Sequence, residues 1–335
     1  MRAVRAGLLA AAAIALAAAG PPPAPPPLPA AIASRTIEGR FEPGNFDYLR
    51  GYFPEATEAE KAEYLAIVGW LDQCEAEGQR RVAAELAVLG ASPSGERMSA
   101  AANLCQQVFR GDQFAGFASH AELATAAAEA RLVFSTLVEA IRLSEQRIGP
   151  ITPDFARDLE ARTLGEQLLR LSFNWTYGAH DNPRLPQMSA SARTVFNALA
   201  MGELARVDFA NTEWLKAHVG AKGWPKYSEV GEKAANAAWL LAQHADHDPA
   251  FQLTALRLME PLLATKEVSP GDYAYLYDRI TLKLTGKQRY ATQFWCVDGK
   301  MQPRPLEQPD EVDALRAAMQ LQPLAEYRQF FRPTC

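Results

Sequence analysis

The sequence lacks an apolar run of the about eighteen residues that a membrane-spanning helix needs. It also lacks an excess of positive charge, because 34 Lys and Arg against 39 Asp and Glu give a net charge of −5. Nucleic-acid-binding proteins usually carry a basic surface, so this balance excludes that class. With 48% hydrophobic and 22% charged residues, the composition is typical of a globular protein. We therefore expect no nucleic-acid partner and no transmembrane segment in the mature chain.

Several motifs of well-known enzyme classes are also missing. The sequence contains no G-x-S-x-G, H-E-x-x-H, Walker loop or G-x-G-x-x-G. The common α/β-hydrolase, zinc-protease and nucleotide-binding sites therefore have no support from the sequence. Nothing in the sequence indicates a cofactor.

Cysteine is rare, with four residues in 335, and no C-x-x-C motif is present. An even number of cysteines in an exported chain is typical of disulfides rather than of a redox or zinc site. Four cysteines allow three pairings. Proximity in the sequence favours Cys74 with Cys105 and Cys296 with Cys335.

The first twenty residues have the pattern of a secretory signal peptide: Arg2 and Arg5 precede an apolar stretch that ends in small residues. The proline-rich segment 21–30 reads as a spacer. Cleavage fits after Ala19 or after Ala33, and an uncleaved membrane anchor is the alternative. We expect residues 1–33 to be signal peptide and spacer, and the protein to be periplasmic or secreted.

From residue 34 onward the hydrophobic period is helical almost throughout. Capping boxes at Thr57–Glu60 and Ser119–Glu122 predict two long helices, and Asp248-Pro249 predicts a helix start. Pro261 is expected to kink the helix that follows. The remaining helices are expected near 98–109, 153–172, 190–206, 212–219, 229–245, 272–284 and 310–319.

Gly149-Pro150 and Thr152-Pro153 interrupt the helical pattern, with Thr152 as a predicted helix cap. We place a boundary there, between an N-terminal helical region (34–150) and a C-terminal helical domain (151–335). Within the latter, residues 289–297 and 300–306 flank Asp298-Gly299 and predict a β-hairpin. The expected fold is mainly α and multi-helical, with one C-terminal β-hairpin and two disulfides.

Unusual polar residues gather in the C-terminal half, most densely at Gln243–Asp248. On a regular helix over 229–245, His244 lies on the apolar arc and Asp246 on nearly the opposite side. A catalytic pair of these two residues therefore requires the helix to end first. His244 is either a core histidine bonded to a buried carboxylate or carbonyl, or a general base.

Other candidates lie further along the chain. Asp278 and Arg279 sit together within a predicted helix, where an ion-pair network is the simpler interpretation and a carboxylate or phosphate clamp the functional one. A pocket beside the His244 helix could be lined by further polar or aromatic residues: Trp224, Gln243, Tyr290, Thr292 and Gln293. His244 and His247 are spaced for a metal, but Asp248 is needed as a cap, so we predict no metal site.

These residues together resemble an uncharacterised bacterial domain family. The resemblance rests on Asp208 with Asn211, on Gly223-Trp224-Pro225, on Gln243–Asp246 with Asp248-Pro249, on Tyr275–Arg279 and on Gln288–Gln293, and it covers about residues 200–330. Ala291 stands where that family has glycine. The resemblance implies no activity, only that these residues belong to one unit.

Two functions fit the sequence. The preferred one is an exported, disulfide-containing helical protein whose C-terminal domain binds an unknown small molecule or protein partner. The alternative is a hydrolase or transferase with His244 as general base, oriented by Asp246 or Asp278, and with Arg279 and Gln293 holding the substrate. The preference rests on the absence of an evident nucleophile or metal set.

Overall fold

The computed structural model of the chain describes residues 27–93, 103–149, 154–176 and 186–331. Within them the protein is mainly α-helical, as the sequence predicts. The α-helices are α1 (Ala30–Ala33), α2 (Glu58–Val88), α3 (Asn103–Gln107), α4 (His120–Ile148), α5 (Phe155–Ser172), α6 (Ala190–Lys222), α7 (Tyr227–Val230), α8 (Glu232–Gln243), α9 (Pro249–Met259), α10 (Pro270–Thr285), α11 (Val312–Ala318) and α12 (Leu324–Tyr327). The strands are β1 (Thr36–Ile37), β2 (Arg40–Phe41), β3 (Phe294–Val297) and β4 (Lys300–Pro303).

The predicted helix starts are confirmed where a capping side chain is present. Thr57 and Glu60 form a complete capping box at α2, and the Ser119 hydroxyl accepts from the Glu122 amide at α4. At α9 the Asp248 carboxylate accepts from the Phe251 amide, and Pro249 occupies the first turn. Each cap satisfies a backbone amide that the first helical turn leaves without a partner.

Several predicted helix boundaries are wrong. The helices expected at 190–206 and 212–219 are one helix, α6, because no Gly or Pro between 206 and 212 interrupts it. Helix α8 ends at Gln243 rather than Ala245, and α9 ends at Met259 and continues as a 3-10 turn that contains Pro261. Thr152 lies outside the described residues, and Asp154 caps α5.

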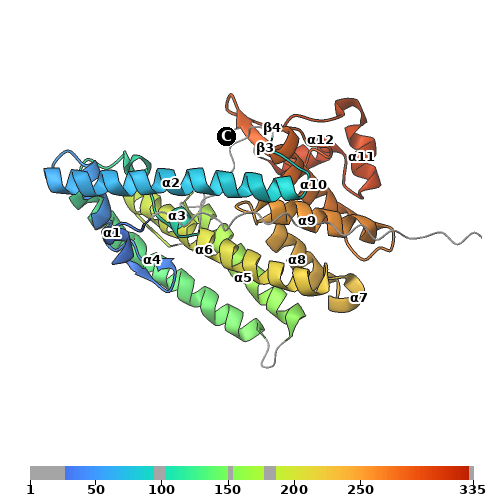
Figure 1. Cartoon of the computed structure of the whole chain (residues 1–335), viewed down its shortest axis with the longest axis horizontal. Coiled ribbons are helices and arrows are strands. Elements are labelled where there is room, and N and C mark those ends of the chain that lie inside the picture. The colour runs from blue at the N-terminus through green and yellow to red at the C-terminus, as the bar shows by residue number, and fades with distance from the viewer. Residues whose placement is uncertain (1–26, 94–102, 150–153, 177–185, 332–335) are drawn as a thin grey trace, which may run out of the picture.

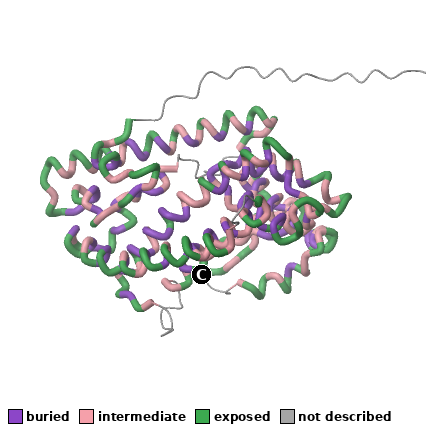
Figure 2. The backbone as a smooth tube through the Cα atoms, turned by 90° about the horizontal axis from the view of Figure 1, so that it is seen from below, coloured by how far each residue is buried: buried purple, intermediate pink, exposed green. Residues whose placement is uncertain are grey.

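Two large hydrophobic cores and one smaller cluster hold the described helices together. The first includes Leu123 of α4 and Phe196 of α6. The second includes Leu241 of α8, and also Val82 and Leu86 from the last part of α2. Helix α2 reaches both cores because it runs along the long axis of the molecule (Figure 1). Buried and exposed segments alternate along the long helices, as expected for helices that bury one face (Figure 2).

Within the described residues the strands form two small antiparallel hairpins rather than the single one predicted, and one isolated parallel bridge joins Gln288 to Leu306. Strands β3 and β4 flank Asp298-Gly299 as expected, and both turn residues have positive φ. However, β3 begins at Phe294, whereas the sequence predicted a strand from residue 289. The unpredicted hairpin, β1–β2, lies near the N-terminus and turns at Glu38-Gly39, where φ is again positive.

The disulfide between Cys74 of α2 and Cys105 of α3 is confirmed, with Cα atoms 6.3 Å apart. It is the only disulfide whose two partners both lie among the described residues. Cys335, the predicted partner of Cys296, lies outside them.

The predicted signal peptide lies largely in residues 1–26, which are also outside the described residues. Ala31 and Ile32 are buried in the first core, although the sequence assigned them to the spacer. Ile32 is fully buried, so part of the segment assigned to the spacer contributes to the core. The described residues include no helix of the length and apolarity needed to cross a membrane. The predicted boundary at 150–153 is likewise not described.

Candidate functional site

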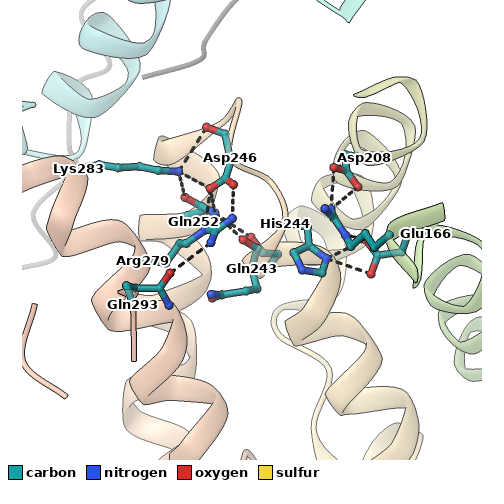
Figure 3. Close-up of polar contacts among 11 residues, drawn as sticks. Glu166, Asp208, Gln243, His244, Asp246, Gln252, Arg279, Lys283 and Gln293 are labelled. Atoms are coloured by element: carbon teal, nitrogen blue, oxygen red, sulfur yellow. Dashed lines mark hydrogen bonds and ion pairs between the residues drawn. The ribbon is translucent and has the colours of Figure 1, made fainter. Parts of the chain in front are cut away.

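The polar residues 243–248, which the sequence singled out, lie at the end of α8 and in the turn that follows it. His244 is the first residue after the helix, and its amide still donates to the Leu240 carbonyl. The chain then turns through Ala245–His247 into α9. Although the helix ends before Asp246, His244 and Asp246 do not pair with each other. They belong to two adjacent networks, which we call the His244 network and the Asp246 network (Figure 3).

In the His244 network, the imidazole is held by Glu166 of α5. Nδ1 lies 2.8 Å from Oε2 and 3.0 Å from Oε1 of Glu166, whose side chain is fully buried. An ionised carboxylate only accepts hydrogen bonds, so Nδ1 carries the hydrogen and Nε2 of a neutral imidazole is an acceptor. The His244 side chain is 15% exposed, and its Nε2 has no hydrogen-bond partner among the described residues.

Glu166 is ionised because its neighbours compensate for its burial. Burial raises the pKa of Glu166, but the hydrogen bond and charge of His244, together with the Arg170 charge, outweigh burial and lower the pKa. Arg170 lies one turn further along α5 and places Nη2 2.9 and 2.8 Å from the carboxylate oxygens of Asp208 on α6. Burial raises the pKa of Asp208 to about 8, an effect that Arg170 opposes.

In the Asp246 network, two cations of α10 hold one carboxylate. Arg279 donates from Nε (2.9 Å) and Nη2, and Lys283 donates from Nζ (2.7 Å). Burial raises the pKa of Asp246, but the charges of Lys283 and Arg279 outweigh it and hold the pKa well below the ordinary value. Lys283 also donates to Gln252, whose amide in turn donates to the Gln243 carbonyl at 3.0 Å. The Asp246 side chain remains 42% exposed.

Asp278, a predicted catalytic residue, does not face His244. Its fully buried carboxylate accepts hydrogen bonds from the backbone amides of Arg289, Tyr290 and Thr292 and from the Thr292 hydroxyl, at 2.7 to 3.0 Å. Asp278 therefore anchors the segment 288–293 to α10. This arrangement also explains why β3 starts late, since these amides bond a carboxylate rather than a neighbouring strand.

Most of the predicted ligand-binding residues are buried in the protein interior rather than exposed at a pocket. Tyr290 and Thr292 are buried beside Asp278, and Trp224 is buried in the second core. Gln293 alone of the anchored segment reaches the Asp246 network, where its Oε1 accepts from Nη1 of Arg279 at 3.3 Å. Gln243 lies between the two networks in Figure 3, and its buried Oε1 has no partner among the described residues.

Sequence reasoning missed Glu166, Arg170 and Lys283. Glu166 carried a detectable signal, because it lies seven residues after Leu159 and three before Leu169 and so on the buried face of α5. A charged residue on an apolar face needs a partner. No group of three or more His, Cys, Asp or Glu side chains in the described parts of the chain could hold a metal ion.

The fold and the site define a mainly α-helical domain in which a buried glutamate holds a partly exposed histidine. The chain belongs to a family of unknown function, DUF6624, whose family model matches residues 153–333. The resemblance seen in the sequence is thus confirmed, and the match begins earlier than predicted, so that it includes Glu166 and Arg170. Neither the curated proteins nor the solved structures contain a match to this chain.

Proposed function

We propose that the family domain binds a small polar molecule at the surface where Nε2 of His244 is open. The observation that carries this proposal is the contrast between the two ring nitrogens of one side chain. Nδ1 is fixed by a fully buried carboxylate, whereas Nε2 has no partner among the described residues. A side chain oriented in this way can form a directed hydrogen bond to a ligand without a further loss of side-chain entropy.

The charges around His244 favour recognition by hydrogen bonds over recognition by net charge. Glu166 and Asp208 are bonded to Arg170, and Asp246 is bonded to Arg279 and Lys283. A ligand with hydroxyl or amide groups can bond Nε2 of His244 without displacing an ion pair. Gln243 lies between the two networks, and its buried Oε1 has no partner among the described residues.

Acid–base catalysis is the second candidate, and one observation favours it specifically. A carboxylate that accepts from Nδ1 leaves Nε2 as the basic nitrogen, which is the arrangement of a general base. Here Glu166 takes the orienting role that the sequence assigned to Asp246 or Asp278. In a hydrolase or transferase, Nε2 would take the proton of a water or hydroxyl that attacks the substrate.

The substitution His244→Asn separates ligand binding from structure, because the Asn amide can still donate to Glu166 but has no atom in place of Nε2. We expect the free energy of unfolding of His244→Asn to lie within about 1 kcal/mol of that of the parent. We expect His244→Ala to lower the free energy of unfolding by about 1–3 kcal/mol, because Glu166 loses a partner. Urea denaturation with intact disulfides measures both.

The function is tested by thermal-shift screening of small polar compounds against the parent and His244→Asn. We expect at least one compound to raise the melting temperature of the parent in a saturable way and to leave His244→Asn unchanged. His218→Asn, the same substitution on α6, is the control and should respond like the parent. A compound set that shifts none of the proteins, or all of them equally, would contradict the proposal. Turnover of a bound compound that is lost in His244→Asn would establish the catalytic alternative.

We also propose that the protein is exported to the periplasm or the cell exterior. Its N-terminal pattern and the Cys74–Cys105 disulfide support this location, because disulfides persist in oxidising compartments. Fractionation of cells that produce the full chain, followed by mass measurement of the mature N-terminus, tests the proposal.

A further inference from the structure

A second site lies away from His244, in a cavity of about 290 Å³ between the N-terminal helices and α6. Its wall is mostly apolar and is formed by Phe41, Phe109, Phe134, Val138 and Leu199. Gly202 of α6 also lines it, and a Cβ there would lie 3.4 Å from the Phe109 ring. The volume is close to the lower end of the range for sites that bind small molecules.

The wall is held in place by buried hydrogen bonds. Gln107 is almost fully buried, and its side-chain oxygen accepts from the Phe41 amide at 2.9 Å. Its amide nitrogen donates to Asn103 of α3 and to the carbonyl of Gly39. These hydrogen bonds tie the β1–β2 hairpin to α3 beside the cavity.

The polar residues at the cavity differ in whether their charge is compensated. Three carboxylates line the cavity, and each has an arginine partner: Glu203 pairs with Arg206 and Arg40, Glu42 with Arg40, and Glu139 with Arg142. Arg131 has no carboxylate within ion-pair distance among the described residues. Its Nη2 donates to the Gly44 carbonyl and to Asn45, while its buried Nε has no partner.

We propose that this cavity binds a small amphipathic anion, with its apolar body against the phenylalanine wall and its negative group at Arg131. The Arg131 guanidinium, which has no carboxylate partner among the described residues, favours a negatively charged group on the ligand. The apolar wall favours an aromatic or short acyl body. This site is independent of His244, so the failure of either proposal leaves the other unaffected.

The fluorescent probe 8-anilinonaphthalene-1-sulfonate tests the site, since it combines an aromatic body with a sulfonate. We expect saturable binding of one probe per parent molecule at pH 7. Ser135→Trp places a large ring at the mouth of the cavity and should weaken binding at least about tenfold. Thr136→Trp, an exposed neighbour on α4 that does not line the cavity, is the matched control and should bind like the parent.

Displacement by octanoate and by octylamine tests the charge. We expect octanoate to displace the probe at concentrations about tenfold lower than octylamine does, and Arg131→Gln to abolish this preference. Absence of probe binding to the parent, equal weakening by both Trp substitutions, or equal displacement by the two octyl compounds would overturn the proposal. The comparison of octanoate with octylamine uses the parent alone, so it tests the proposal even where Arg131→Gln is unstable.

Discussion

The side chain of His247 lies buried against Phe209, with the two ring centroids 4.5 Å apart. Its Nε2 is buried and has no hydrogen-bond partner among the described residues. Burial lowers the pKa of His247 to about 4, against an ordinary value of 6.5; Asp248 opposes the shift and Arg81 adds to it. The folded protein therefore holds this histidine neutral down to about pH 4.

The consequence for stability has a definite sign. Between pH 6.5 and pH 4 the unfolded chain binds a proton at His247 that the folded chain does not, so the free energy of unfolding falls as the pH falls. A shift from 6.5 to about 4 corresponds to a loss of about 3 kcal/mol. His247→Phe removes the titrating group. The free energies of unfolding of parent and variant are measured in urea at pH 7 and at pH 4, and the difference between the two proteins should change by this amount between the two pH values. A constant difference would show that His247 does not titrate as proposed.

The residues of the candidate site differ in how visible they are in the sequence. His244 and Asp246 stand out because they belong to a dense polar segment, and the family resemblance includes both. Glu166, which fixes the His244 ring, lies far away in the sequence on another helix. Pairing across helices depends on packing, which the period of one helix does not specify, so only the need for a partner could be predicted.

At the scale of elements, the segment 288–293 shows how one carboxylate shapes a loop. Asp278 accepts from three backbone amides and one hydroxyl, and within this segment Ala291 has a φ of +52°. That backbone conformation favours glycine, the residue that the sequence resemblance leads us to expect at this position. A positive φ accounts for that expectation without any close approach of a ligand.

Replacement of this carboxylate should destabilise the protein strongly. Asp278→Asn leaves the shape nearly unchanged but directs an NH2 group at backbone donors inside the core, so we expect a loss of about 2–4 kcal/mol. Asp310→Asn, at an exposed position, is the control and should change the free energy by less than about 0.5 kcal/mol. Urea denaturation at pH 7 measures both variants. Equal effects would mean that the Asp278 hydrogen bonds do not stabilise the segment.

The elements themselves were predictable to different degrees. Starts with a capping side chain, such as Thr57 and Asp248, follow from local sequence because the cap and the amide are neighbours. The ends at Gln243 and Met259 and the late start of β3 were mispredicted. The start of β3 depends on a distant partner, because the amides of Arg289, Tyr290 and Thr292 donate to Asp278, and local periodicity does not contain this information.

At the scale of the whole molecule, the Cys74–Cys105 disulfide connects α2 to α3, and α3 packs against α6. The two cysteines are 31 residues apart, and closing a loop of this length stabilises the folded state by about 3–4 kcal/mol in the chain-entropy model. We expect the double substitution Cys74→Ala with Cys105→Ala to lower the free energy of unfolding by about this amount, measured in urea. A reducing agent should destabilise the parent more than this variant. An unchanged stability in the variant would show that packing alone fixes α3.

Helix α6 carries residues of both proposed sites. It spans 33 residues, or about 50 Å at 1.5 Å per residue. Gly202 lines the amphipathic cavity, and Asp208, six residues later on the same helix, bonds Arg170 of the His244 network. A continuous helix cannot shorten or unwind locally without breaking backbone hydrogen bonds. The spacing between Gly202 and Asp208 along the helix axis is therefore fixed at about 9 Å.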